Sequence, residues 1–161
     1  MKKISDKYTI YGRKKGRKKI HSVDKDFFVN YKIILDTDIK KNKRNTIDIG
    51  SGKGENTLFL AKKNPDALII AIEIFWDGNI NLCKKLSKLK LYNVKIFLSN
   101  VLKLFDHLNK VDYFNEIWIL FPYPWPKKKH YKRRLINDNF FIKVYPYLKK
   151  NGKIFIQLVK R

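Results

Sequence analysis

The chain has 161 residues, of which 37 are Lys or Arg and 14 are Asp or Glu, so its formal net charge is +23. Hydrophobic residues make up 44% of it and aromatic residues 14%, which excludes an intrinsically disordered composition despite the charge. We therefore expect one globular domain with a full core, and the charge favours a polyanionic partner.

The basic charge could also come from genome composition and not from selection for a polyanionic partner. Only six of the 37 basic residues are Arg, and Asn and Ile are also abundant, as an AT-rich genome produces without any selection for binding. The single Cys83 excludes an intramolecular disulfide, and His21, His107 and His130 lack metal-ligand spacing, so no metal site is expected. No apolar run approaches the roughly 18 residues of a membrane-spanning helix. We expect a cytoplasmic protein without membrane association.

Strand and helix patterns alternate from residue 45 onwards. The first strand pattern is NTIDIG, and a glycine loop and a short helix that Pro65 ends follow it. Further apolar runs predict strands at 67–73, 93–100, 115–121 and 152–159, the last after an Asn151–Gly152 turn. Helical patterns lie at 75–91, 101–108 and 136–150.

This alternation predicts an α/β fold with a doubly wound, mostly parallel, Rossmann-like sheet. Ligands of such sheets bind at the carboxyl ends of the strands. Residues 1–44 carry the run YGRKKGRKK and lie outside the alternation. We expect them to form a basic N-terminal extension that contacts RNA, and residues 45–161 to form the ligand-binding domain.

The glycine loop DIGSGKGEN, residues 48–56, has the spacing of several nucleotide-binding loops. Glu55 stands where a Walker A motif or a dinucleotide loop requires a later glycine. A carboxylate there would repel a pyrophosphate, but it is harmless beside a sulfonium cation. The remaining match is the G-x-G-x-G loop of S-adenosylmethionine-dependent methyltransferases.

Polar groups follow three successive predicted strands. Asp48 suits the ammonium group of a methionine moiety, and Gly50 and Gly52 allow close backbone approach. Glu73 suits two ribose hydroxyls, and the amide of Asn100 suits an adenine edge. Each group alone is more often a helix cap or a solvated strand end, but the conjunction predicts S-adenosylmethionine as the cofactor.

The stretch FPYPWPKKKHYKRR, residues 121–134, follows the fourth predicted strand, and we call it the aromatic–basic loop. It could be a surface loop stiffened by proline with solvated lysines. Because it follows the fourth strand, it should lie over the place where the methyl group is delivered. This favours an RNA reader, in which Tyr123 and Trp125 stack on a base. The residues 127–129 and 132–134 then hold phosphates.

The segments GSGKGEN, AIEIF and FPYPWPKKKHYKRR resemble the bacterial tRNA (guanine-N7)-methyltransferases, whose loop reads Phe-Pro-Asp-Pro-Trp-Pro-Lys-Lys-Arg-His followed by Lys-Arg-Arg. The resemblance implies tRNA as the partner and methylation of a variable-loop guanine. It places Asp48, Glu73 and Asn100 at cofactor positions. The substrate-binding residues expected in the loop are Trp125, Lys127, His130, Arg133 and Arg134.

The chain departs from this family at two places. Tyr123 stands at the position of the family's Asp, which makes it the candidate catalytic residue, and Asn100 stands where Asp is usual. The family also continues beyond FIQLVKR through a further helix and strands. We therefore expect a sheet that lacks these last elements and has residues 152–159 as an exposed apolar edge.

Three functional hypotheses follow. The first is the tRNA (guanine-N7)-methyltransferase, in which the N7 lone pair attacks without losing a proton, so alignment matters more than a general base. The alternative is a catalytically degenerate module that binds tRNA or a partner protein. A methyltransferase acting on protein or a small molecule is third, because the basic loop weighs against it. The sequence does not fix the oligomeric state.

Overall fold

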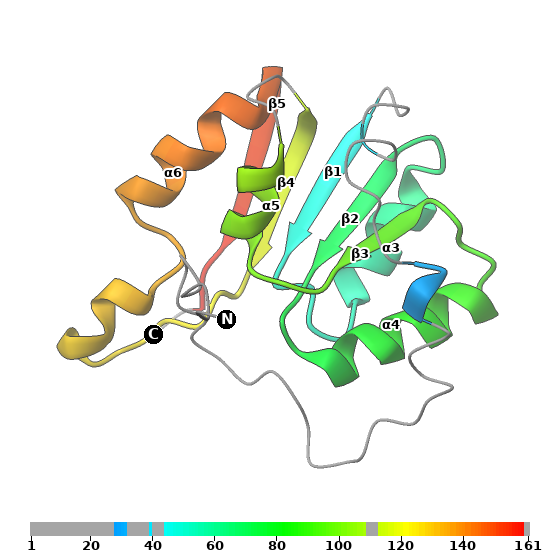
Figure 1. The fold of residues 1–161 in the computed structure, drawn as a ribbon, viewed down its shortest axis with the longest axis horizontal. Helices are drawn as coiled ribbons and strands as arrows, with labels where there is room; N and C mark the ends of the chain where they lie inside the picture. Colours follow the sequence, from blue (N-terminus) through cyan, green and yellow to red (C-terminus); the bar gives the residue numbers. More distant parts are fainter. Residues whose placement is uncertain (1–27, 32–38, 40–43, 109–112, 160–161) are drawn as a thin grey trace, which may run out of the picture.

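The computed structural model describes residues 28–31, 39, 44–108 and 113–159. They form a five-stranded sheet in the order β3-β2-β1-β4-β5, and every pair of neighbouring strands is parallel (Figure 1). This confirms the doubly wound parallel sheet that the sequence predicts. The strands are β1 (Asn45–Ile49), β2 (Leu68–Ile72), β3 (Val94–Phe97), β4 (Phe114–Leu120) and β5 (Leu148–Gln157).

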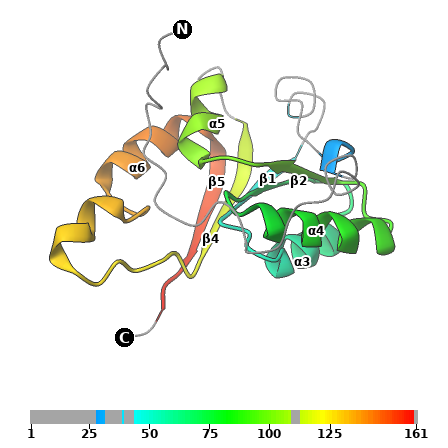
Figure 2. The same ribbon diagram turned by 60° about the horizontal axis from the view of Figure 1, so that its bottom comes forward.

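Helices cover both faces of the sheet (Figure 2). The helices α3 (Glu55–Lys63) and α4 (Trp76–Lys88) lie on one face, and α5 (Val101–His107) and α6 (Asp138–Val144) lie on the other. Alternate residues of β2 point to the two cores: Ile70 packs with the α5 and α6 residues, and Ile69 packs with the α3 and α4 residues. Burial on both faces explains why this strand is apolar throughout.

The direction of winding reverses between β1 and β4. The chain proceeds from β1 to β2 and β3 on one side of the sheet, and then crosses to β4 and β5 on the other. Such a switch point leaves a crevice at the carboxyl ends of the two central strands, which is where ligands of open α/β sheets bind.

The helix expected over 136–150 is shorter than predicted. The helix α6 ends at Val144, a 3-10 turn covers Tyr145–Tyr147, and β5 begins at Leu148. Pro146 is the physical reason, because it has no backbone N–H to continue the helical ladder.

The turn expected at Asn151–Gly152 lies inside β5 as an irregularity of the strand. The register passes from Phe114 opposite Leu148 to Glu116 opposite Lys153. Asn151 has a φ of 67°, and a Cβ on Gly152 would lie 3.0 Å from the carbonyl oxygen of Phe114. The segment therefore needs a residue without a side chain to keep β5 against β4.

The strand β5 is one of the two edges of the described sheet, as expected. It pairs with β4, and its side chain Ile156 and the following Leu158 and Val159 are exposed. The predicted extension at 1–44 lies almost wholly outside the described residues, so its RNA contact stays a prediction. No helix within the described ranges has the length and apolar character needed to cross a membrane.

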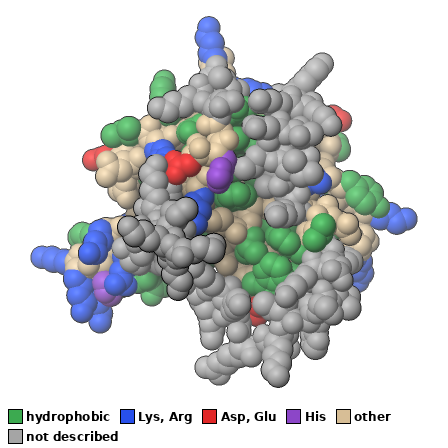
Figure 3. Space-filling model, viewed as in Figure 1, with side chains coloured by type: hydrophobic (Ala, Val, Ile, Leu, Met, Phe, Trp, Pro, Cys, Tyr) green, Lys and Arg blue, Asp and Glu red, His purple; other side chains and the backbone are tan. Residues whose placement is uncertain are grey.

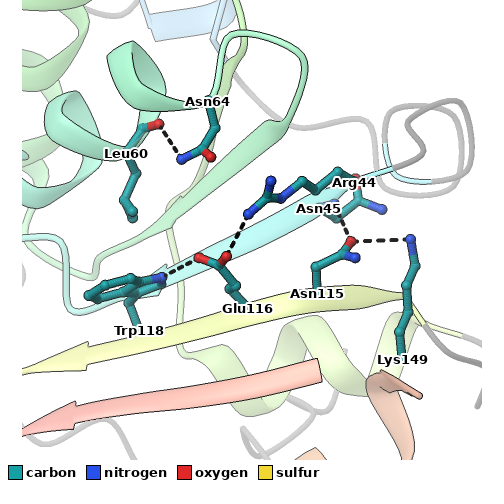
Figure 4. A network of polar contacts seen from close by, with 8 residues as sticks. All are labelled: Arg44, Asn45, Leu60, Asn64, Asn115, Glu116, Trp118 and Lys149. Carbon is teal, nitrogen blue, oxygen red and sulfur yellow. Dashed lines mark hydrogen bonds and ion pairs between the residues drawn. The ribbon is translucent and has the colours of Figure 1, made fainter. Parts of the chain in front are cut away.

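A polar network joins the sheet near the amino ends of the central strands (Figure 4). Arg44 donates to Oε1 of Glu116 at 2.7 Å, and the indole of Trp118 donates to Oε2 at 2.9 Å. Lys149 of β5 donates to Asn115 of β4. Burial alone would raise the pKa of Glu116, but these hydrogen bonds and the charge of Arg44 together hold that pKa below its usual value.

Candidate active site

A pocket of about 570 Å³ lies at the switch point, over the carboxyl ends of the strands. One wall comes from residues that follow β1, β2 and β3, and it contains three of the predicted cofactor residues: Gly50, Glu73 and Asn100. The other wall is the aromatic–basic loop after β4. It contributes four predicted residues: Tyr123, Trp125, Arg133 and Arg134.

The glycine loop is held by backbone hydrogen bonds to the end of β2. The amides of Gly50 and Ser51 both donate to the carbonyl of Ile72, at 2.8 and 3.2 Å. Gly50 has a φ of +74°, which L side chains rarely adopt, and a Cβ placed on it would meet nothing within 4 Å. Its backbone therefore faces open space in the pocket, as close approach of a ligand requires.

The carboxylate of Glu73 joins the glycine loop to the start of α4. One oxygen accepts from the amide of Gly52 at 2.9 Å. The other accepts from the amides of Ile74 and Phe75, at 2.7 and 3.0 Å. These bonds fix a negative charge at the pocket wall, and a carboxylate has lone pairs left to accept further hydrogen bonds there.

Asp48 occupies a different place from the one its sequence position suggests. It is 2% exposed and does not line the pocket. Its oxygens accept from Thr57 at 2.6 Å and Asn56 at 3.0 Å. Burial raises its pKa, against the opposing effect of these two bonds. In the structure, Asp48 thus ties the end of β1 to the first turn of α3, and its contact with an ammonium group stays a prediction.

Asn100 lines the pocket and also caps a helix. Its side-chain oxygen accepts from the amide of Leu102 at 2.9 Å, in the N-cap position of α5. This orients the side chain at the pocket wall, where Ser99 and Val101 lie beside it. The proposed contact between the Asn100 amide and an adenine edge stays a prediction.

Trp125 is the centre of the aromatic–basic loop. Its ring meets Tyr123 edge to face at 4.9 Å and His130 at 5.5 Å. The guanidinium of Arg133 lies 5.0 Å from the ring centre. Tyr123 is 68% exposed at the rim. The loop thus gathers aromatic rings and cations at the pocket mouth, as the sequence predicts.

Two of the predicted substrate residues lie outside the pocket lining. Lys127 is exposed and precedes the 3-10 helix Lys128–Arg133, which also contains His130. Partial desolvation and the charges of Arg133 and Lys127 lower the pKa of His130. The basic side chains of this segment project from the lower left of the molecule in Figure 3. Lys132 and Arg133 also line the pocket, whereas the other basic side chains of the segment can meet only a ligand that extends out of it.

Several lining residues carry no signal in the sequence. Asn139 and Lys143 of α6 line the pocket from the face of the sheet that α5 and α6 cover. Lys143 also forms an ion pair with Asp106 of α5 at 2.7 Å. Gly78 does not line the pocket but supports its glycine loop, and nothing in the sequence indicated this contact: a Cβ there would lie 2.4 Å from the carbonyl oxygen of Gly52. In the described ranges no three His, Cys, Asp or Glu side chains gather closely enough to hold a metal ion.

A family model described as "Putative methyltransferase" matches residues 42–158. The tRNA (guanine-N(7)-)-methyltransferase of Mycoplasmopsis pulmonis (strain UAB CTIP) is 38% identical over 76% of this chain and 59% of that protein. The protein of the same name from Prochlorococcus marinus (strain NATL1A) is 41% identical over 69% of this chain and 53% of that protein.

Among solved structures, an rRNA methylase from Streptococcus thermophilus has a TM-score of 0.57 and 16% identity, and covers 85% of this chain and 68% of that one. This likeness concerns the fold alone. The chain spans about half the length of the curated relatives it matches. Its family match extends from the start of the sheet to the end of β5, and the chain therefore belongs to the methyltransferase family that includes the tRNA (guanine-N7)-methyltransferases.

Proposed function

We propose that this chain binds S-adenosylmethionine and methylates N7 of a variable-loop guanine in tRNA. The observation that carries the proposal is one pocket with two unlike walls. A glycine loop with a fixed carboxylate forms one wall, and an aromatic, cationic loop forms the other. The curated relatives named tRNA (guanine-N(7)-)-methyltransferase support the same activity.

The residues at the first wall fit the cofactor. The open space at Gly50 leaves room for a ligand against the backbone. Glu73 would accept hydrogen bonds from ribose hydroxyls, and Asn100 would face the adenine. When bound, S-adenosylmethionine supplies a methyl carbon on a positively charged sulfur, which a guanine N7 lone pair can attack without releasing a proton.

The second wall would hold the RNA. Tyr123 and Trp125 offer ring faces or edges to a guanine, and stacking of this kind is worth about 1–3 kcal/mol per base. The exposed lysines beyond the pocket would contact phosphates. Because N7 carries no proton, these residues contribute alignment, which alone can supply a large part of a rate enhancement.

Transfer of tritiated methyl groups to tRNA tests the reacting atom. Unmodified tRNA is compared with the same transcript made with 7-deazaguanosine, in which a C–H group replaces N7. We expect label in the first RNA and none in the second. Equal labelling of both would exclude N7 as the acceptor. No label in either, with S-adenosylmethionine binding still seen by calorimetry, would favour the binding module.

A further inference from the structure

Arg134 has unusual contacts for a residue of a basic run. Its Nε donates to the carbonyl of Pro124 at 2.9 Å, and its Nη2 donates to the carbonyl of Trp125 at 3.3 Å. Its guanidinium lies 3.7 Å from the centre of the Tyr131 ring. The neighbouring Arg133 instead lies against the indole of Trp125. Two adjacent arginines thus face different parts of the same loop.

The backbone that Arg134 contacts is strained. Trp125 has a φ of 41°, in the left-handed region that favours glycine. A bulky residue keeps such a conformation only where the surroundings impose it. The prolines before and after Trp125 fix their own φ angles but donate no backbone hydrogen bonds. The two bonds from Arg134 bind this peptide segment from outside.

Arg134 also connects the loop to α6. Its backbone amide donates to Tyr131 at 3.0 Å, and its carbonyl accepts from the side chain of Asn137 at 2.9 Å. Asn137 in turn caps α6 by accepting from the amide of Phe140. One residue therefore links the Trp125 part of the aromatic–basic loop to the 3-10 helix of that loop and to the start of α6, all of which contribute to the pocket wall.

We infer that Arg134 is a positioning residue, which holds the Trp125 backbone and thereby sets the ring against the base, rather than a phosphate ligand as its basic surroundings suggest. The inference rests on the proposed function for its kinetic consequence. Its structural part, the connection of the Trp125 backbone to the 3-10 helix and α6, stands without the proposed function. Only arginine can donate from two nitrogens of one planar group to two carbonyls in this way. Lysine has a single ammonium nitrogen at the end of a flexible side chain.

The variant Arg134→Lys separates the two roles, since lysine remains a good phosphate ligand. We expect its kcat for methyl transfer to fall by about tenfold or more from misalignment, while the salt dependence of its tRNA affinity stays unchanged. Trypsin should cleave after Lys127 to Lys129 about tenfold faster, as mass spectrometry would show, because the loop has lost a charge-assisted hydrogen bond. The matched control Lys88→Arg, on the exposed face of α4, should behave as wild type in both assays.

The variant Arg134→Gln provides the second measurement, with Lys88→Gln as its control. If Arg134 binds a phosphate, the salt dependence of tRNA binding should weaken by about 0.7–0.9 in log–log slope, and Arg134→Lys should match wild type in kcat and cleavage. That result would overturn the inference. If the wild-type chain transfers no methyl group, the proposed function fails, but the cleavage rates still decide whether Arg134 holds the loop.

Discussion

The contact between Gly78 and the glycine loop gives a quantitative prediction for Gly78→Ala. Alanine normally stabilises a helix interior by about 0.5–1 kcal/mol relative to glycine. Here the new Cβ would lie 2.4 Å from the carbonyl oxygen of Gly52, whereas Cβ contacts under 3.0 Å essentially never occur. The loop or the start of α4 must therefore move by at least about 0.6 Å, because both partners are backbone.

This displacement acts directly on the pocket. The amide of Gly52 donates to the carboxylate of Glu73, which also accepts from the amides of Ile74 and Phe75, just before α4. Moving the loop stretches these bonds and shifts the wall that would hold the cofactor. We expect the free energy of unfolding to fall by about 1–2 kcal/mol, as overpacking exceeds the gain in helix propensity. The affinity for S-adenosylmethionine should fall about tenfold, or about 1.4 kcal/mol.

Urea unfolding and isothermal titration calorimetry measure the two effects. The control is Asn81→Ala in the same helix, because Asn81 is exposed. It should stabilise the chain by a few tenths of a kcal/mol through propensity alone, with unchanged cofactor affinity. If Gly78→Ala were as stable as this control and bound the cofactor like wild type, the close approach of α4 to the loop would not position the site.

Three further predictions concern single side chains. The folded pKa of Glu116 is lowered, so its stabilisation is present above its ordinary pKa of about 4.5 and is lost as the pH falls through the folded value. Glu116→Gln should therefore lower the unfolding free energy by about 1 kcal/mol at pH 7 and by progressively less as the pH falls below about 4.5, measured by urea unfolding. The lowered pKa of His130 keeps the imidazole neutral at pH 7–8. In filter binding, His130→Gln should therefore have the same pH dependence of tRNA affinity as wild type between pH 7 and 8. A loss of affinity over this range in the wild type but not in the variant would contradict the prediction. Tyr123→Asp should raise the rate of methyl transfer if the tyrosine limits activity, and an unchanged rate would exclude that explanation.

The sequence predicted the parts of the fold that depend on local pattern. Continuous apolar runs such as LIIAI marked the buried strands, and the glycine loop and Glu73 were found because their spacing is a property of one βαβ unit. The end of α6 was placed too late because the apolar pattern continues past Pro146, and there the missing N–H decides the outcome.

Residues whose position depends on tertiary contact could not be predicted. Gly78 matters because α4 packs against a loop 26 residues earlier in the chain. Asp48 lies near the end of β1, one residue before its last, but the side chains of Thr57 and Asn56 donate to its oxygens. Arg134 reads as one more cation in a basic run, and only the fold shows that it reaches back to Pro124.

Strand cleavage of the methylated tRNA tests the central claim most directly. Borohydride and aniline break an RNA chain at 7-methylguanosine, so unmodified tRNA incubated with the purified chain and S-adenosylmethionine reports both the reaction and its site. We predict a single break at a variable-loop guanine, lost when S-adenosylmethionine is omitted. No break, or breaks at guanines throughout the tRNA, would contradict the account.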